Sequence, residues 1–225
     1  MNKKLLGIFA AVIGVASVAS ASPVACGPPP PPAQIVVQIG GGPSAFSYSC
    51  GGLTFSNFSA TDFGNSNGVF VTLGDANFDS ATGYVNLTFS PNLLNVQAFQ
   101  DFHLFFTVTG AINGIDLSVG GDFATINERA CKNAMDTNGN CTNGIIDQLG
   151  VLTNSSGQAN KSVSFSTPNS PTFIFKDIGH DAGGDLTSFT QSFHTSTVPE
   201  PMTLSMMGIG LLGLGLARRK QMGKK

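Results

Sequence analysis

A short polar loop carries the densest set of possible metal ligands in this 225-residue chain. Counted from its first aspartate, positions 1, 3, 5, 7 and 12 offer side-chain oxygens, and these are Asp136, Asn138, Asn140, Thr142 and Asp147. Ca²⁺ takes roughly six to eight oxygen ligands, and a loop that supplies them at this spacing suits it. Cys141 stands where such a loop turns on glycine, and Asn143 where an aliphatic residue packs. The sequence therefore leaves two alternatives, a weak calcium site or a polar loop closed by a disulfide bond.

The histidines give little support to a catalytic site. His103, His180 and His194 all lie outside the motifs that identify common nucleophile, zinc or phosphate sites. His103 falls on the side of its predicted strand opposite the apolar residues, so we expect it to face solvent. A glycosidase needs a pair of carboxylates, and the part of the chain between the two terminal segments has one glutamate, Glu128. We predict no catalytic residue, no enzyme activity and no cofactor apart from the calcium alternative.

Four cysteines suit disulfide bonds in an oxidising compartment, and they are Cys26, Cys50, Cys131 and Cys141. Arithmetic alone allows three pairings. The short separation of the last two favours a bond between them, which leaves a bond between Cys26 and Cys50. A zinc site is disfavoured because the chain has no Cys-x-x-Cys pair and no histidine near the cysteines.

Alternating apolar and polar residues predict the strands that hold these loops. The two clearest predicted strands are residues Val85 to Phe89 and residues Phe102 to Val108. A third, from Ile115 to Val119, follows Asn113-Gly114, a strong hairpin signal. Short strands between glycine- and asparagine-rich turns favour an all-β fold, an antiparallel β-sandwich of the jelly-roll kind.

Two exceptions to the β pattern are predicted as helices, from Glu128 to Ala134 and from Gly144 to Leu152. Residues 22–45 are predicted to be a proline- and glycine-rich linker with one edge strand from Gln34 to Ile39. Five consecutive prolines in it form a stiff polyproline II spacer. The sandwich body is then expected over residues 46–197.

The N-terminus has the three parts of a signal peptide. Lys3 and Lys4 supply the positive charge, and an apolar run ends at Val18. Ala19 and Ala21 form a small-residue cleavage site, so signal peptidase is expected to remove residues 1–21 and leave Ser22 as the first residue.

The C-terminus, residues 198–225, also has three parts. The first is the tetrapeptide Val198, Pro199, Glu200 and Pro201, and the second is an uncharged apolar run from 202 to 217. As a helix this run would be about 24 Å long, close to the thickness of a bilayer core. The third part, residues 218–225, begins with Arg218, Arg219 and Lys220, which are expected to stop transfer and stay on the cytoplasmic side.

This tail resembles the PEP-CTERM sorting signal of bacteria that carry an exosortase, and the resemblance covers residues 198–219. It implies export, transient anchoring in the inner membrane by a single transmembrane helix, and cleavage near Pro-Glu-Pro by the exosortase. It also implies a final place on the cell surface or in the extracellular matrix of a biofilm. Tails of this kind have been grouped as an ice-binding protein C-terminal domain, but the body has no array of Thr-x-Thr rungs that would form an ice-binding face.

Removing the terminal segments changes the charge of the chain. Residues 22–197 contain four basic and twelve acidic side chains, a formal charge of −8. Such a surface repels phosphate backbones, so we exclude nucleic acid as a partner. The functional hypothesis is a structural protein of the surface or matrix. The alternative is a carbohydrate-binding module for exopolysaccharide, which exposed phenylalanine or tyrosine would favour, and a hydrolase comes third.

Overall fold

The computed structural model describes residues 24–26, 34–38, 42–43, 47–91, 93 and 98–195. The predicted signal peptide, sorting motif, apolar run and basic tail lie outside these residues. In the part of the chain that is described, no helix is long and apolar enough to span a membrane.

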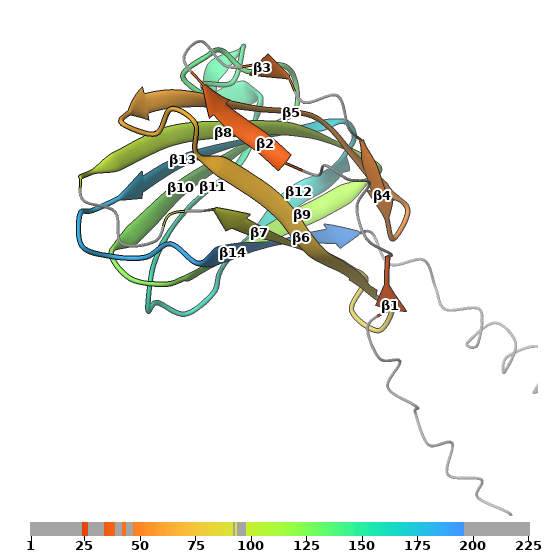
Figure 1. Cartoon of the computed structure of the whole chain (residues 1–225). Helices are drawn as coiled ribbons and strands as arrows, with labels where there is room; N and C mark the ends of the chain where they lie inside the picture. The colour runs from red at the N-terminus through yellow and green to blue at the C-terminus, as the bar shows by residue number, and fades with distance from the viewer. Residues whose placement is uncertain are drawn as a thin grey trace, which may run out of the picture.

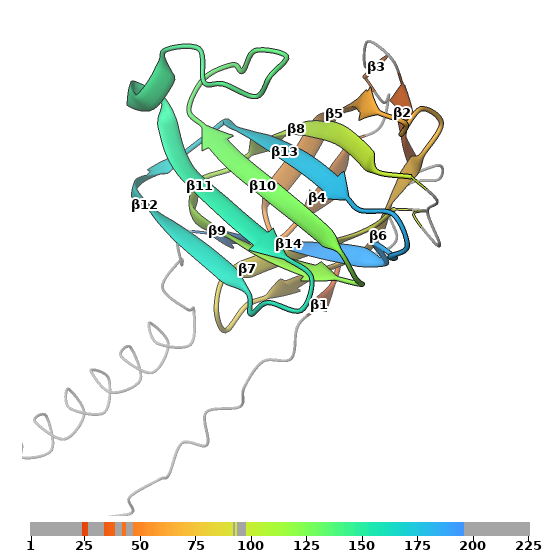
Figure 2. The same cartoon turned by 90° about the vertical axis from the view of Figure 1, so that its left-hand side faces the viewer.

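Two sheets of antiparallel strands pack face to face as a β-sandwich (Figure 1). The first, here called the β8 sheet, has the order β11-β10-β13-β8-β5. Its strands are β5 Leu53–Gly64, β8 Gln100–Thr109, β10 Ala124–Cys131, β11 Gln148–Ser155 and β13 Thr172–His180. Figure 2 shows β11, β10, β13 and β8 side by side.

The second, here called the β14 sheet, has the order β6-β7-β14-β9-β12. Its strands are β6 Phe70–Asp79, β7 Tyr84–Pro91, β9 Ile112–Gly120, β12 Lys161–Asn169 and β14 Ser188–Thr195. Three short strands, β1 Val24–Ala25, β3 Gly42–Pro43 and β4 Tyr48–Cys50, pair with β6 or β5. The antiparallel sandwich predicted from the alternating pattern is therefore confirmed.

The strand β2, Gln34–Gln38, differs from the prediction in its place. It lies between β5, to which it is parallel, and β6, to which it is antiparallel, so it joins the two sheets and is not an edge strand. Ile35 is fully buried there. Burial on this face explains why a short segment behind a proline run is ordered into the sandwich.

Alternation along the strands builds the core. In β7, Val85, Leu87 and Phe89 are fully buried, while Tyr84 and Asn86 point outward and are only partly covered. Phenylalanine rings contact one another between the sheets, and these include Phe55, Phe58, Phe89, Phe106, Phe189 and Phe193. Each such ring contributes about 2–3 kcal/mol by its removal from water.

Both predicted helices are wrong. The first segment begins in β10, where Ala124, Ile126, Glu128 and Ala130 alternate inward, and ends in the loop after Cys131. The alternation was missed because Glu128, a charged residue, occupies an inward position. A buried glutamate needs a partner from another strand, and the local sequence does not show that partner. The second segment is one turn of 3₁₀-helix, η1 Gly144–Ile146, followed by β11.

Two disulfide bonds are present, Cys26–Cys50 and Cys131–Cys141, the pairing expected from the sequence. The second closes the loop between β10 and β11, which projects from the end of the sandwich (Figure 2). Arg129 Nη1 donates hydrogen bonds to the Gly139 carbonyl at 2.8 Å and to Asn140 Oδ1 at 2.9 Å. Gly139 packs so closely on the Phe175 ring that a Cβ atom there would lie 2.2 Å from it.

Candidate functional site

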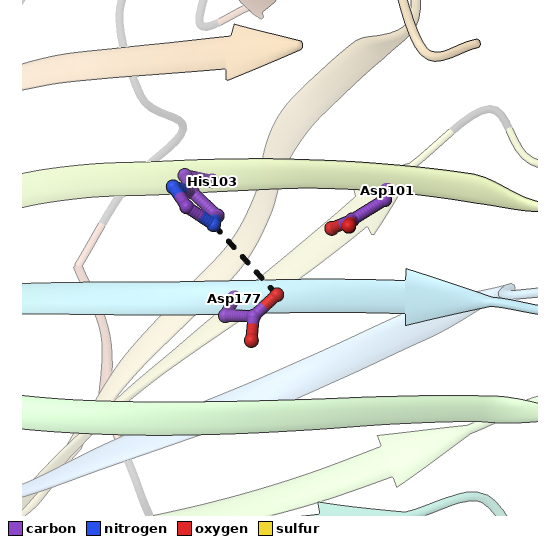
Figure 3. Close-up of side chains that lie close together, drawn as sticks. All are labelled: Asp101, His103 and Asp177. Atoms are coloured by element: carbon purple, nitrogen blue, oxygen red, sulfur yellow. Dashed lines mark ion pairs between the residues drawn. The ribbon is translucent and has the colours of Figure 1, made fainter. Parts of the chain in front are cut away.

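The outer face of the β8 sheet brings three ionisable side chains together. Asp101 and His103 are two residues apart in β8, so both point outward. The register of β13 places Asp177 directly opposite His103 and Gly179 opposite Asp101. Figure 3 shows the three side chains on these two neighbouring strands.

The histidine and the aspartates of this cluster are close together, but the distance between His103 and Asp177 is longer than a hydrogen bond. His103 Nε2 lies 3.8 Å from Asp177 Oδ1, which is an ion-pair distance but too long for a hydrogen bond. The second oxygen of Asp177 accepts a hydrogen bond of 3.2 Å from Asn127. Two buried atoms, Asp101 Oδ1 and His103 Nδ1, have no hydrogen-bond partner. Polar atoms of this kind are costly to bury.

The surroundings of Asp101 disfavour its ionised form. Loss of water contact raises the pKa of the Asp101 carboxyl, and the negative charge of Asp177 raises it further. His103 opposes this effect only in part. A hydroxyl donor or a cation placed between the two carboxylates would relieve the repulsion.

Aromatic rings surround the cluster. The Phe63 ring stacks on the His103 ring at 3.8 Å, and the edge of Phe175 packs against it at 4.8 Å. Phe63 is 50% exposed and Phe99 is 48% exposed. The Phe99 ring lies over Gly179, since a Cβ at that position would be in ordinary contact with it at 3.8 Å.

We call this surface the aromatic–acidic patch, and its members are Phe63, Phe99, Asp101, His103 and Asp177. Ionised carboxylates accept hydrogen bonds from hydroxyl groups. The faces of aromatic rings carry partial negative charge and attract the C–H groups of an apolar sugar face. Together these groups are suited to a polyhydroxylated ligand that lies along β8 and β13.

The same cluster has the donor set of a divalent metal site. One imidazole nitrogen and two carboxylates suit a divalent transition ion. The three donor atoms lie within 4.8 Å of one another. Ligands of one zinc ion at about 2.0–2.2 Å are at most about 4.2 Å apart, so the cluster would have to contract to hold one.

The predicted calcium ligands form two separate groups. Asp136 Oδ1 accepts hydrogen bonds from the backbone of Asn138 and Asn140, and its other oxygen accepts one from the Asn140 side chain. Asp147 accepts hydrogen bonds from Asn133 and Asn143, and Thr142 donates to the Ala134 carbonyl. The carboxylates of this loop accept hydrogen bonds from residues of the loop itself. Calcium binding by the loop stays a prediction.

The expectation that His103 faces solvent is wrong. Its side chain points away from the core, but Phe63, Phe175 and Phe105 cover it and leave it 9% exposed. The alternating pattern correctly assigned the outer face. It could not show that this face of the sheet carries aromatic rings of its own.

The other two histidines lie apart from the patch. His194 bonds Asp116 at 2.8 Å and stacks on Tyr84, on the outer face of the β14 sheet. His180 is fully buried at the end of β13, and neither ring nitrogen has a hydrogen-bond partner. Neither histidine forms a set of nucleophile and base with its neighbours.

The sequence did not single out the members of the patch as a site. Asp101 and Asp177 are 76 positions apart, and only the pairing of β8 with β13 brings them together. The one local signal was the Asp-x-His spacing at the start of a strand, which places both side chains on one face.

Comparison with known proteins separates the tail from the body. Residues 197–220 match the family model of the PEP-CTERM protein-sorting motif. No curated protein matches the chain. One solved structure, "Structure of TmCBM61 in complex with beta-1,4-galactotriose", matches 60% of this chain and 83% of its own at 8% identity. Its TM-score is 0.31, a similarity too small to indicate a shared fold or ligand.

The sorting motif indicates an exported protein that is sorted by an exosortase. The two disulfide bonds are consistent with an extracellular location. The motif does not extend into the sandwich and assigns no activity to it.

Proposed function

We propose that this exported protein binds a carbohydrate polymer through the aromatic–acidic patch and serves as a component of the cell surface or extracellular matrix. Signal peptidase and an exosortase process its two ends, and the apolar run anchors it in the inner membrane only in transit. The sandwich acts as a binding module without catalytic residues. The carbohydrate-binding alternative is thus favoured over a purely structural role.

One observation carries this proposal, the presence of two exposed aromatic rings beside the cluster of Asp101, His103 and Asp177. About half of the 18 phenylalanine side chains are buried, and four in the described residues are exposed: Phe63, Phe70, Phe99 and Phe123. Isolated exposed apolar residues are ordinary on protein surfaces. Here Phe63 stacks on His103 and Phe99 lies over Gly179, the register partner of Asp101, and this combination of rings and carboxylates favours a ligand with both apolar faces and hydroxyl groups.

The charge of the protein narrows the class of polymer. Residues 22–197 carry a formal charge of −8, and the patch itself presents two aspartates. Polymers rich in uronate or sulfate would be repelled by such a surface. We therefore propose a neutral polysaccharide as the ligand.

Affinity electrophoresis tests this proposal. The secreted protein is run through native gels that contain neutral polysaccharides, acidic polysaccharides or no polymer. We expect retardation by at least one neutral polymer and none by acidic ones, and we expect EDTA to leave the retardation unchanged. Equal mobility in all gels would contradict the proposal, and loss of retardation in EDTA would instead assign the cluster to a metal ion.

A further inference from the structure

A second polar cluster lies inside the sandwich, far from solvent. Glu128, Lys176 and Gln191 are each fully buried. Glu128 on β10 and Lys176 on β13 are register partners within the β8 sheet. Gln191 projects from β14, so it reaches the cluster from the opposite sheet.

The lysine amine is held against both other side chains. Lys176 Nζ lies 2.8 Å from Glu128 Oε2 and also donates a hydrogen bond to Gln191 Oε1. The amide nitrogen of Gln191 donates to the Ser192 carbonyl at 3.4 Å, and the Gln191 side chain also interacts with the Glu128 carboxyl group. The second oxygen of Glu128 is buried without a hydrogen-bond partner.

Burial favours the uncharged forms of the acid and the amine, whereas the Phe189 ring, 5.5 Å from Lys176 Nζ, favours the charged amine. Loss of hydration raises the pKa of Glu128 and lowers the pKa of Lys176, and their mutual attraction opposes both effects. An uncharged amine is a nucleophile, and a protonated carboxyl group is a proton donor.

A buried ion pair is weak evidence for a stabilising role, because desolvation of the two charges offsets their attraction. Gln191 Oε1 supplies the buried amine with a hydrogen-bond acceptor, and the same contact places the amine beside a carboxamide group. The three side chains together have the parts of an acyl transfer, a nucleophile, an acyl donor and a group that carries protons, in a fully buried site.

We propose that Lys176 and Gln191 become joined by an intramolecular Nε-(γ-glutamyl)lysine isopeptide bond, with Glu128 as the proton carrier. The lone pair of Lys176 Nζ attacks Gln191 Cδ and forms the new C–N bond. The bond from Cδ to Nε2 breaks and ammonia leaves. Glu128 gives a proton to the departing nitrogen and receives one from Nζ, so it ends as it began, and no oxidant or reductant takes part.

The product would be a covalent link between the two sheets. The disulfide bonds fasten the N-terminal segment to β4 and close the loop after β10, but neither joins β13 to β14. A cross-link at Lys176 and Gln191 would hold the two sheets together, and reducing agents would not break it.

Peptide mapping of the secreted protein after unfolding and disulfide reduction tests this directly. Cleavage on the N-terminal side of aspartate cuts the backbone at Asp177, Asp181 and Asp185, all between the two linked residues. We expect peptide 147–176 to remain covalently attached to the peptide that begins at Asp185. The attached pair should be about 17 Da lighter than the sum of the two peptides, since one ammonia is lost. Trypsin should cut after the exposed Lys161 but not after Lys176.

Two variants assign the roles of the cluster. Lys176→Arg keeps the positive charge and should yield the two peptides separately. Glu128→Gln should also yield them separately while the protein still unfolds cooperatively, whereas Glu128→Asp should restore part of the cross-link.

Separate peptides at unmodified mass from the folded wild-type protein would overturn the proposal. A link from Lys176 to Glu128, lighter by about 18 Da, would overturn the assignment of Gln191 as acyl donor. The wild-type measurement decides the matter even if a variant fails to fold.

Discussion

Individual side chains on the outer face of the β8 sheet occupy positions that cost folding free energy. His103 sits between the rings of Phe63 and Phe175 with one nitrogen unpartnered, and Asp101 faces another carboxylate. Surfaces selected only for solubility do not need such contacts, because an outward residue can ordinarily turn to water. Binding of a ligand would satisfy these groups, and this is why single substitutions here are informative.

Phe63→Ala should weaken carbohydrate binding about tenfold, because the exposed ring provides the stacking surface beside the carboxylates. The readout is the polymer concentration that half-retards the protein in native gels. Val151→Ala is the matched control. Val151 is 46% exposed on β11 at the far edge of the same sheet, so its loss should leave binding unchanged. Equal effects of the two substitutions would show that binding does not involve the patch.

Asp101→Asn should stabilise the free protein at neutral pH. The pKa of Asp101 is raised by desolvation and by Asp177, so the folded state holds its proton to a higher pH than the unfolded chain. Stability therefore falls as pH rises from the usual aspartate range of about 4 through the raised pKa, and stays lower above it. The variant should melt about 1–3 °C higher than wild type at pH 7.

This difference in melting temperature should vanish at acid pH, below the usual aspartate range. Asp181→Asn, in the exposed turn after β13, is the control and should show no such dependence on pH. A lower melting temperature for Asp101→Asn at pH 7 would mean that the carboxylate is held by favourable contacts.

Strands and turns are the level at which the sequence was most informative. Clean alternation predicted the strands around Val85, Phe102 and Ile115, because each has one apolar and one polar face. The pattern failed at β10, where Glu128 occupies an inward position that only Lys176 of the adjacent strand makes tolerable. It also failed for β2, whose pairing with both sheets depends on residues more than twenty positions away. Both failures arise from tertiary contacts, which no local pattern contains.

Gly121→Ala should cost the sandwich about 3 kcal/mol or more. Gly121 has φ +98°, and a Cβ there would lie 1.9 Å from the Asp185 carbonyl oxygen. That oxygen also accepts a hydrogen bond of 2.7 Å from Asp122, which fixes the turn after β9 against the start of the β14 segment. The measurement is the free energy of unfolding in urea.

Gly157→Ala separates the cost of a positive φ from the cost of the steric clash with Asp185. Gly157 has a similar φ of +75°, but nothing lies within 4 Å of its Cβ position. This variant should lose only about 1–2 kcal/mol, the cost of a left-handed residue. Equal losses at both positions would mean that the contact with Asp185 is relieved by movement of the turn.

The whole molecule combines a sorted tail with a rigid, acidic sandwich. The tail specifies how the protein is handled, and its sequence alone sufficed to identify it. The outer surface of the sandwich required the structure, because the patch is assembled from β5, β8, β13 and the segment before β8. The carbohydrate binding that we propose for this acidic protein suits a matrix of neutral polymer, because a neutral polymer does not repel its negative charge.

Processing at both ends should depend on different enzymes. Terminal peptide mapping of the protein from its own host should show Ser22 as the first residue. It should also show loss of the residues beyond Pro-Glu-Pro, but only when the exosortase is present. Retention of residues 202–225 with and without the exosortase would indicate a permanent membrane anchor. The protein would then act while tethered to the membrane and not in the matrix.

The most direct test of the central claim is equilibrium binding of the mature protein to the neutral polysaccharide isolated from its own host. Calorimetric titration of wild type and of the double variant Phe63→Ala, Asp177→Asn should be compared at equal fold stability. We expect saturable binding by wild type and a loss of at least about thirtyfold in affinity, about 2 kcal/mol, for the double variant. Absence of binding by wild type, or equal binding by both proteins, would contradict the assignment of the aromatic–acidic patch as a carbohydrate site.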